Sequence, residues 1–354
     1  MILITGATGL VGSHLAFELL KKEEKIIALK RKTSNIEKLK TIFSFYTDKD
    51  TANKYFNRIE WREADLLNIY EIYEALEGIS MIYHTAAIVS FEKKHGYDIL
   101  FNNVNSTANL VNAALDRKVE KFIHVSSVAS LGDNPNGLIT EDTHAIPEQK
   151  LSFYSKSKYY SELEVWRAQQ EGLNTIILNP SVILGPLADW KSKVIGKVLF
   201  LVWEGLPFYV NVRTGFVDVR DVVKAMSMLA EKEVYEQRFI ISAENLYIKE
   251  LLDIIAETMG KPKPKYLINK YWIKAAYWLE QICSKFNLTD PILTKEYLNY
   301  VNIDQRFSSE KLLRTLPDFK YIPINDTINF IVNLFLESLS EKEKKQKSLL
   351  SIFQ

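Results

Sequence analysis

The first twenty residues, MILITGATGLVGSHLAFELL, place a glycine-punctuated turn between an apolar run and a segment with apolar residues at helical spacing. Residues 1–5 predict a buried strand, and residues 10–20 predict a helix. Because glycine has no Cβ, the backbone N–H groups of such a turn and the helix N-terminus behind it can approach a pyrophosphate. The opening therefore predicts a dinucleotide site, with a ligand-free tight turn as the alternative. The contacts expected from this turn are Gly6, Thr8, Gly9, Leu10, Val11 and Gly12.

Strand-like and helix-like segments alternate through residue 180, which predicts an α/β fold with a doubly wound parallel sheet. The expected strands are 1–5, 25–29, 59–62, 80–84, 121–125 and 175–178, and the expected helices include 10–20, 68–76, 95–117 and 153–170. Residues 33–57 predict a helix and a loop. Ligands of such sheets bind beyond the carboxyl ends of the strands. The small residues Thr85, Ala86 and Ala87 and the later Pro180 and Val182 follow strands there and are expected to contact the same cofactor.

The alternation loosens after residue 180, which predicts a second, smaller unit. We assign 1–180 to a Rossmann-type NAD(P)-binding domain to which 216–244 return. Residues 181–215 and 245–335 form a mostly helical substrate-binding lid, with expected helices 248–259, 270–286, 308–315 and 325–338. Residues 336–354 form a charged tail without a core-forming pattern. The apolar stripe of 270–286 favours a core helix over a face that lies on a membrane surface.

Composition excludes several classes of protein. The formal net charge of the 354 residues is +1, so neither nucleic acid nor an anionic membrane is expected as a partner. The single cysteine, Cys283, allows no internal disulfide and fits a reducing compartment. No apolar run reaches the roughly 18 residues of a transmembrane helix, and the first strand leaves no room for a signal peptide, so a cytoplasmic location is expected. The histidines lack the spacing of metal ligands.

The type of cofactor depends on the ends of the second and third strands. An acidic residue at the tip of the second strand would bind a ribose 2′-hydroxyl, whereas an arginine favours a 2′-phosphate. Here the tip carries Arg31, which favours NADP over NAD, with a solvated basic loop as the alternative. Asp65, followed by Leu66, ends the third strand, where it would bind the adenine amino group or cap the next helix.

Tyr154 and Lys158 lie four residues apart in FYSKSKYY and therefore share one face of a helix. A free tyrosine has a pKa of about 10, and a neighbouring ammonium is expected to lower it. Tyr154 would then act as a general acid toward a carbonyl or as a base toward an alcohol. Ser127 ends the preceding strand and would bond the same oxygen. Asn103, on the helix beside it, would hold a water that relays protons to Lys158.

The chain resembles the extended short-chain dehydrogenases/reductases in TGATGLVG, ADL, HTAA, NNVNST, VSS, YSKSK and NPSVILGP. Within that family, ALKRKTSN, HTAA and GFVDVRDVV most resemble the branch of dihydroflavonol-4-reductases and 3β-hydroxysteroid dehydrogenases. The resemblance implies reversible carbonyl–alcohol chemistry, usually with NADP for the reductases, and a catalytic set of Ser127, Tyr154, Lys158 and Asn103. It also implies that helices 95–117 and 153–170 pair in a homodimer. One departure is Asn179, where many relatives carry arginine.

Two other functions remain open. An NAD-dependent nucleotide-sugar epimerase uses the same catalytic set in this family and would need cations for a diphosphate; candidate cations are Lys191, Lys193, Lys197 and Arg213. A non-catalytic NADP-binding protein is the other alternative. A sugar 4,6-dehydratase is disfavoured because Val128 and Ala129, not an acidic pair, follow Ser127, which leaves water elimination without a proton donor.

A small-molecule carbonyl or alcohol is the expected partner. It would lie between 89–91, the loop after Ser127, and the lid at 182–213. Apolar side chains of that lid favour an apolar or aromatic substrate, with a simple lid core as the alternative. They are Leu199, Phe200, Trp203, Phe208 and Tyr209.

Overall fold

The computed structural model describes residues 1–89, 96–132, 134, 137–144, 151–192, 194–232, 234–268 and 304–339. The expected helix 270–286, Cys283, Phe91, Lys193 and the tail from residue 340 lie outside these ranges. Among the described residues, none of the helices combines the length and the apolar character needed to cross a bilayer.

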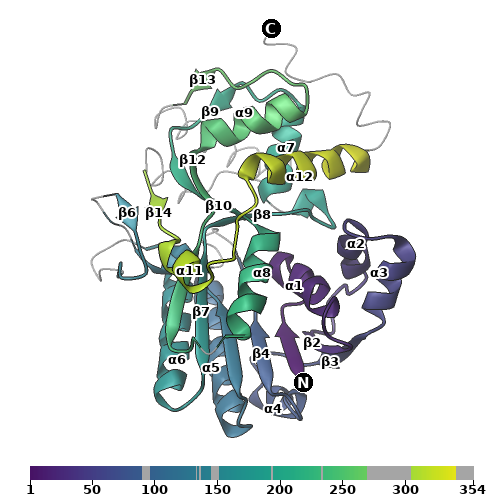
Figure 1. Ribbon diagram of the computed structural model, residues 1–354, viewed down its shortest axis with the longest axis vertical. Coiled ribbons are helices and arrows are strands. Elements are labelled where there is room, and N and C mark those ends of the chain that lie inside the picture. The colour runs from purple at the N-terminus through teal and green to yellow at the C-terminus, as the bar shows by residue number, and fades with distance from the viewer. Residues whose placement is uncertain are drawn as a thin grey trace.

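Seven parallel strands form the main sheet, in the order β11-β7-β5-β4-β1-β2-β3 (Figure 1). The strands are β1 (Ile2–Thr5), β2 (Ile26–Lys30), β3 (Ile59–Glu63), β4 (Met81–His84), β5 (Lys121–Val125), β7 (Thr175–Pro180) and β11 (Gln237–Ile241). This order confirms the doubly wound sheet. The direction of winding reverses between β1 and β4, which is where sheets of this kind bind ligands.

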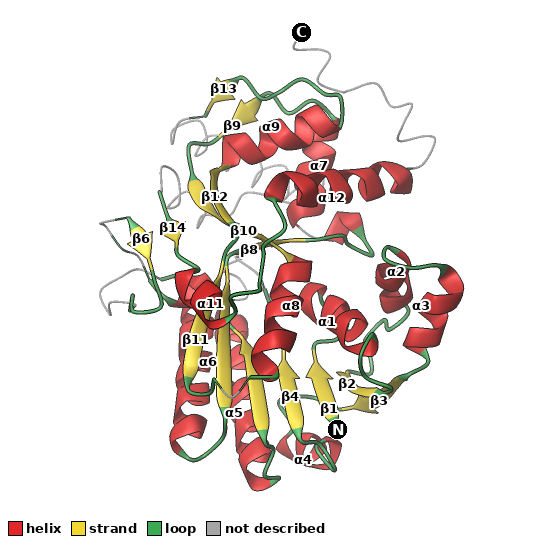
Figure 2. Cartoon of the chain, in the orientation of Figure 1, coloured by secondary structure: helices red, strands yellow, loops and turns green. Residues whose placement is uncertain are grey.

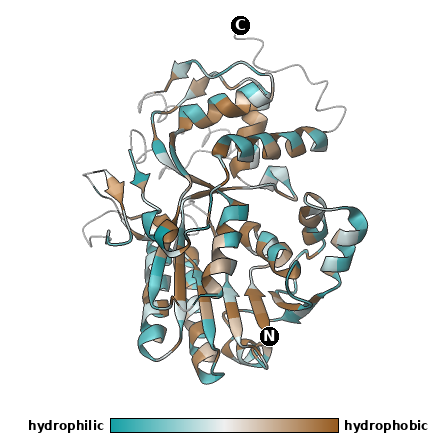
Figure 3. Cartoon of the chain, viewed as in Figure 1, coloured by the Kyte–Doolittle hydropathy of each residue, from teal (hydrophilic) through white to brown (hydrophobic). Residues whose placement is uncertain are grey.

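Helices cover both faces of this sheet, because side chains alternate between the faces along each strand. In β1, Ile4 belongs to one apolar core and Leu3 to the other. The first core is covered by α1 (Leu10–Leu20), α2 (Lys38–Ser44), α3 (Lys49–Phe56) and α8 (Val219–Ala230). The second is covered by α4 (Ile69–Ala75), α5 (Gly96–Asp116) and α6 (Phe153–Gln170). Figure 2 shows these helices around the strands, and Figure 3 shows hydrophobic residues concentrated along the strands.

A smaller layer lies beyond the carboxyl ends of the main strands (Figure 1). Its sheet, in the order β12-β10-β8, consists of β8 (Val182–Leu184), β10 (Arg213–Asp218) and β12 (Glu244–Tyr247). The helices α7 (Val194–Trp203), α9 (Ile248–Thr258) and α12 (Ile324–Ser338) share a third apolar core with it. Two short parallel pairs complete the described strands: β9 (Phe208–Tyr209) with β13 (Tyr266–Leu267), and β6 (Leu138–Ile139) with β14 (Arg306–Phe307). Two 3-10 turns, η2 (Val128–Ser130) and η3 (Trp190–Ser192), also occur.

Two local expectations differ from the structure. The 33–57 segment contains two helices, α2 and α3, rather than one, because Asp48 caps α3 by accepting from the backbone N–H groups of Asp50 and Thr51. The short helix α11 (Glu310–Thr315) has Leu312 in the core of the main sheet, although the domain prediction places it in the lid. The domain boundaries themselves stay a prediction.

Candidate functional site

The turn between β1 and α1 packs directly against the end of β4. Gly6 has a φ of +71°, and a Cβ on it would lie 2.7 Å from the Cα of Ala86. A Cβ on Gly12 would lie 2.2 Å from the carbonyl oxygen of Gly6. Backbone atoms occupy both positions, so only glycine allows this close approach. The turn is closed by a hydrogen bond from the Gly9 N–H to the Gly6 carbonyl, at 2.9 Å.

The N-terminus of α1 fits an anion. Gly9 is its N-cap and supplies no side-chain acceptor, and the first turn, which includes Leu10 and Val11, contains no acidic residue. Backbone N–H groups at such an end attract negative charge, because the helix dipole adds to them. The closely packed glycine turn, followed by this helix end, fits the pyrophosphate of a dinucleotide.

A buried hydrogen-bond chain fixes the strand end beneath this turn. The imidazole of His84 shares hydrogen bonds with Thr5 Oγ1 at 2.8 Å and Thr107 Oγ1 at 3.1 Å. Burial lowers the pKa of His84 to about 3, so its ring is neutral. Thr85 Oγ1 donates to the Thr5 carbonyl at 2.7 Å, and the Ala86 N–H donates to Thr5 Oγ1 at 3.3 Å. These bonds hold the residues after β4 against the glycine turn.

The residues predicted to contact the adenosine lie side by side, because Lys30 pairs with Glu63 at the ends of β2 and β3. Arg31 is exposed, and its backbone N–H donates to Ser34 Oγ at 3.0 Å, which closes a tight turn. Asp65 is exposed as well and accepts from the Leu67 N–H at 2.9 Å. The alternative role of Asp65 as a helix cap is wrong, since Asn68 caps α4 by accepting from the Tyr70 N–H.

The structure brings Ser127, Tyr154 and Lys158 together beyond the end of β5. Ser152 caps α6, which therefore begins at Phe153, one residue before Tyr154. The side chains of Tyr154 and Ser127 share a hydrogen bond. Lys158 is 4% exposed, and its Nζ donates to the carbonyl oxygen of Val125 at 2.9 Å. The expected shared face of the helix is therefore present.

The electrostatics of this group differ from the expectation. Burial raises the pKa of Tyr154, and the hydrogen bond with Ser127 only opposes this effect. Lys158 does not produce the lowering that its spacing predicts; burial lowers the pKa of Lys158 itself to about 8, with Glu162 acting in the opposite direction. Both shifts follow from the removal of water around the charged forms.

Asn103 joins α5 to its neighbours. Its Oδ1 accepts from the Ile88 N–H at 2.8 Å, and its Nδ2 donates to the Ile88 carbonyl and to Ser157 Oγ, each at 3.0 Å. Among the described contacts, the neighbouring Asn102 and Asn105 donate to carbonyls of their own helix, those of Asp98 and Phe101. Asn103 is thus the asparagine of this run with a cross-helix role, and its water relay stays a prediction.

Sequence reasoning missed the buried Glu162 and the contacts of Asn179. The Nδ2 of Asn179 lies 3.1 Å from the Ser127 carbonyl, 3.0 Å from Ser130 Oγ and 2.6 Å from Glu162 Oε1. Glu162 follows Lys158 by four residues, and this helical spacing could have revealed it. Of the remaining predicted contacts, Pro180 is buried at the end of β7, and Val182 is 45% exposed at the start of β8.

Several of the predicted lid residues contact other parts of the protein rather than standing free. Leu199 is fully buried, and the ring of Phe200 packs on Phe335 at 4.9 Å between centroids, so both belong to the lid core. Arg213 lies 3.6 Å from Asp304 and also stacks on an aromatic ring. Lys191 lies over the ring of Phe200. In the described ranges, no group of three or more His, Cys, Asp or Glu side chains is arranged to hold a metal ion.

Comparison with known proteins agrees with this geometry. Residues 2–241 match the model of the NAD dependent epimerase/dehydratase family. The chain is 30% identical over 267 residues to sterol demethylase protein B of Methylococcus capsulatus, covering 75% of this chain and 76% of that protein. It is 26% identical over 266 residues to tetraketide alpha-pyrone reductase 2 of Arabidopsis thaliana, covering 72% and 81%.

The fold is shared with solved epimerases. The structure of UDP-glucuronic acid 4-epimerase from Bacillus cereus, in complex with UDP-glucuronic acid and NAD, superposes with a TM-score of 0.73 at 19% identity, over 96% of this chain and 99% of the other. The family match covers the glycine turn, the group of Ser127, Tyr154 and Lys158, and every strand of the main sheet. The chain therefore belongs to the NAD dependent epimerase/dehydratase family and is an extended short-chain dehydrogenase/reductase.

Proposed function

We propose that this protein is an NADP-dependent oxidoreductase that interconverts a ketone or aldehyde and the corresponding alcohol. The observation that carries the proposal is the hydrogen-bonded pair of Tyr154 and Ser127 above the buried Lys158. The pair lies beyond the carboxyl end of β5, at the same edge of the sheet as the glycine turn that follows β1. Bound NADPH would supply the hydride.

The chain's own residues would manage the oxygen and its proton. Ser127 would orient the substrate oxygen, and Tyr154 would donate a proton to it. Because burial raises the pKa of Tyr154, the phenol holds its proton at neutral pH, as a proton donor to a carbonyl oxygen must. Lys158 would hold the ribose and Asn103 would position the relay water, as the family resemblance implies.

Arg31 supports NADP as the cofactor. Its side chain is exposed at the tip of β2, where a 2′-phosphate would lie, and Lys32, also exposed, follows it. The reductase and sterol-related relatives support a carbonyl or alcohol as the substrate class.

The competing proposal is an NAD-dependent nucleotide-sugar epimerase, which several neighbours in fold are named for. It requires lid cations for a diphosphate. Arg213 is engaged by Asp304 and by the ring of Tyr247, and Lys191 lies over Phe200. These contacts favour the reductase, because a diphosphate that bound to Arg213 or Lys191 would have to displace them.

Two variants test the proposal. Tyr154→Phe removes only the phenolic oxygen, and we expect it to lower NADPH-dependent carbonyl reduction by roughly 10²–10⁴-fold while NADPH still binds. The matched control is Tyr160→Phe, an exposed tyrosine on the same helix. Unchanged turnover in Tyr154→Phe would refute the mechanism. A screen of ketones against UDP-sugars by thermal shift, with NADPH present, tests the substrate class, and stabilisation by UDP-sugars alone would favour the epimerase.

The cofactor is tested by titration. We expect NADPH to bind more tightly than NADH, and Arg31→Ala to weaken NADPH while leaving NADH unchanged. Arg314→Ala, an exposed arginine on α11, controls for loss of a positive charge. Equal or tighter binding of NADH would reject the role of Arg31.

A further inference from the structure

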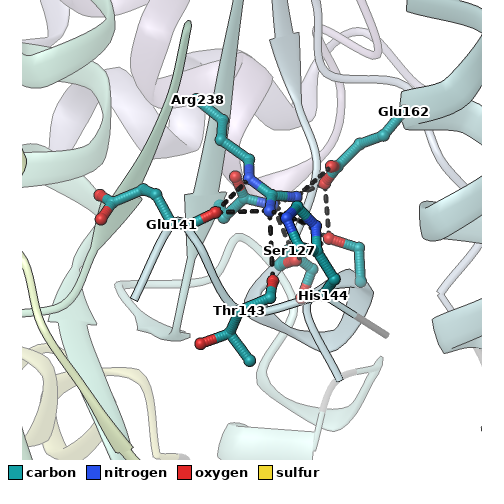
Figure 4. Close-up of polar contacts among 8 residues, drawn as sticks. Ser127, Glu141, Thr143, His144, Glu162 and Arg238 are labelled. Atoms are coloured by element: carbon teal, nitrogen blue, oxygen red, sulfur yellow. Dashed lines mark hydrogen bonds and ion pairs between the residues drawn. The ribbon is translucent and has the colours of Figure 1, made fainter. Parts of the chain in front are cut away.

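A buried polar network connects three elements next to the catalytic group (Figure 4). Glu162 of α6 is 2% exposed, and Asn179 of β7 is fully buried. Arg238 of β11 is the third member, and its Nη1 lies 3.5 Å from Glu162 Oε2. A carboxylate removed from water needs a cation and hydrogen-bond donors, and this network supplies both.

One side of the network holds the turn that carries Ser127. Asn179 Nδ2 lies within 3.1 Å of the Ser127 carbonyl. Ser130 Oγ lies 2.8 Å from that same carbonyl and 2.5 Å from Glu162 Oε1. The direction of the Ser127 side chain therefore depends on a turn that is anchored to Glu162 through two side chains.

The other side holds the segment that follows this turn in the chain. Arg238 Nε donates to the Glu141 carbonyl at 2.8 Å. Its Nη2 donates to the Thr143 carbonyl at 3.2 Å and contacts His144 Nδ1 at 3.3 Å. The carboxylate of Glu141 accepts in turn from the Ile240 N–H at 2.8 Å. Arg238 is thus the one member of the network in Figure 4 that reaches both the 141–144 segment and the catalytic helix.

We propose that Arg238 is a positioning residue, which fixes the Ser127 turn through Glu162 and Asn179 and fixes the 141–144 segment directly. The proposal rests on the proposed function only for the reaction that these segments would serve. The contacts of Arg238 do not depend on which reaction that is. The described polar contacts of Arg238 are with Glu162 and the 141–144 segment, and they include neither Tyr154 nor the glycine turn. Its effect passes through the residues that it holds.

The charge of this pair also acts on Lys158. The groups that face Lys158 are Tyr154 and Glu162 on its own helix, His84 on β4 and His124 on β5. Burial lowers the pKa of both histidines far enough that they are neutral near pH 7, so Glu162 is the charged neighbour. Removing Arg238 leaves the negative charge of Glu162 uncompensated and stabilises protonated Lys158. Removing the charge of Glu162 does the opposite.

The experiment uses the full chain with the variants Arg238→Met, Arg238→Lys and Glu162→Gln. Arg62→Met is the matched control, because Arg62 also binds a glutamate and two backbone carbonyls, those of Ala75 and Glu77, at a distant strand. Amide hydrogen exchange is measured without any substrate. We expect Arg238→Met to raise exchange about tenfold in both 127–131 and 141–144, and Arg238→Lys to give a smaller rise in both.

The second readout is the pH profile of NADPH oxidation with 4-nitrobenzaldehyde as the probe carbonyl. We expect kcat to fall roughly 10–100-fold in Arg238→Met while the KM for NADPH stays within about twofold. The alkaline limb of the kcat–pH profile should move to higher pH in Arg238→Met and to lower pH in Glu162→Gln. General damage to the fold would not produce opposite movements in the two variants.

Several results would overturn the proposal. They are exchange that rises only within β11, exchange that rises equally throughout the protein, or an Arg62→Met variant with the same pattern. Should Arg238→Met fail to fold, the same two segments are compared in Arg238→Lys, and unchanged exchange there overturns it. Failure of the proposed function would appear instead as unchanged turnover in Tyr154→Phe, whereas the exchange pattern tests Arg238 alone.

Discussion

The buried ammonium of Lys158 should make this protein less stable than a variant that lacks it. Burial lowers the pKa of Lys158 from 10.5 to about 8. A pKa lowered this far corresponds to a penalty of about 3.4 kcal/mol for holding the charge in the folded state. The hydrogen bond from the charged Nζ to the Val125 carbonyl, worth about 1.5 kcal/mol, offsets part of that penalty. Lys158→Met keeps an unbranched side chain, so we expect a net gain of about 2 kcal/mol at pH 7.

The gain should depend on pH with a definite sign. Below pH 8 the lysine is charged in both the folded and the unfolded chain, and the penalty is complete. Between about 8 and 10.5 the unfolded chain binds the proton more tightly than the folded one, so the stability of the wild type rises with pH. At pH 9 the advantage of Lys158→Met should therefore have fallen by about 1.4 kcal/mol.

Thermal unfolding of the two proteins checks this reasoning. The expected difference at pH 7 is a rise in Tm of about 3 °C in the variant, together with loss of turnover. Lys156→Met, which removes an exposed lysine from the same helix, should change stability by less than about 0.5 kcal/mol. A Lys158→Met protein that is less stable at pH 7, or whose advantage is the same at pH 9, would refute the assignment of the penalty to burial.

Three further outcomes follow from the geometry. Gly12→Ala should abolish NADPH binding in a titration, because its Cβ would lie 2.2 Å from the carbonyl oxygen of Gly6. Gly9→Ala should keep measurable binding, because its Cβ would lie 3.2 Å from the same oxygen. Equal losses of NADPH binding in the two variants would contradict this. Tyr97 and Phe101 are 77% and 61% exposed on α5, so light scattering should show a dimer that Phe101→Asp dissociates, and a wild-type monomer would count against it. Asp48→Ala should cost about 1 kcal/mol in thermal or chemical unfolding through loss of the α3 cap, and no change would question that cap.

The features that the sequence predicts well are those with a local cause. The glycine turn requires neighbouring backbone segments to pack closely. The three-residue spacing of its glycines therefore predicts the turn without knowledge of the fold. The alternation of strands and helices likewise follows from burial on two faces and predicts the main sheet. Tyr154 and Lys158 share a helix face because they are four residues apart. Their protonation was not predictable in the same way, since burial depends on the segments that cover α6.

The Asn179 position shows why long-range compensation escapes sequence reasoning. An amide there donates hydrogen bonds to Glu162 but leaves its charge unpaired, and the cation comes from β11, 76 residues after Glu162. The register between β7 and β11 explains why Arg238 is the residue that reaches Glu162. Ile240 pairs with Asn179 across the sheet, and Arg238 precedes Ile240 by two, so its side chain lies on the same face, which α6 covers. The residues QRFII alone do not reveal this register, and a shift of one residue would turn Arg238 to the opposite face. The charge that balances Glu162 is therefore set by strand pairing, and this is why Arg238 emerges only when the sheet is known.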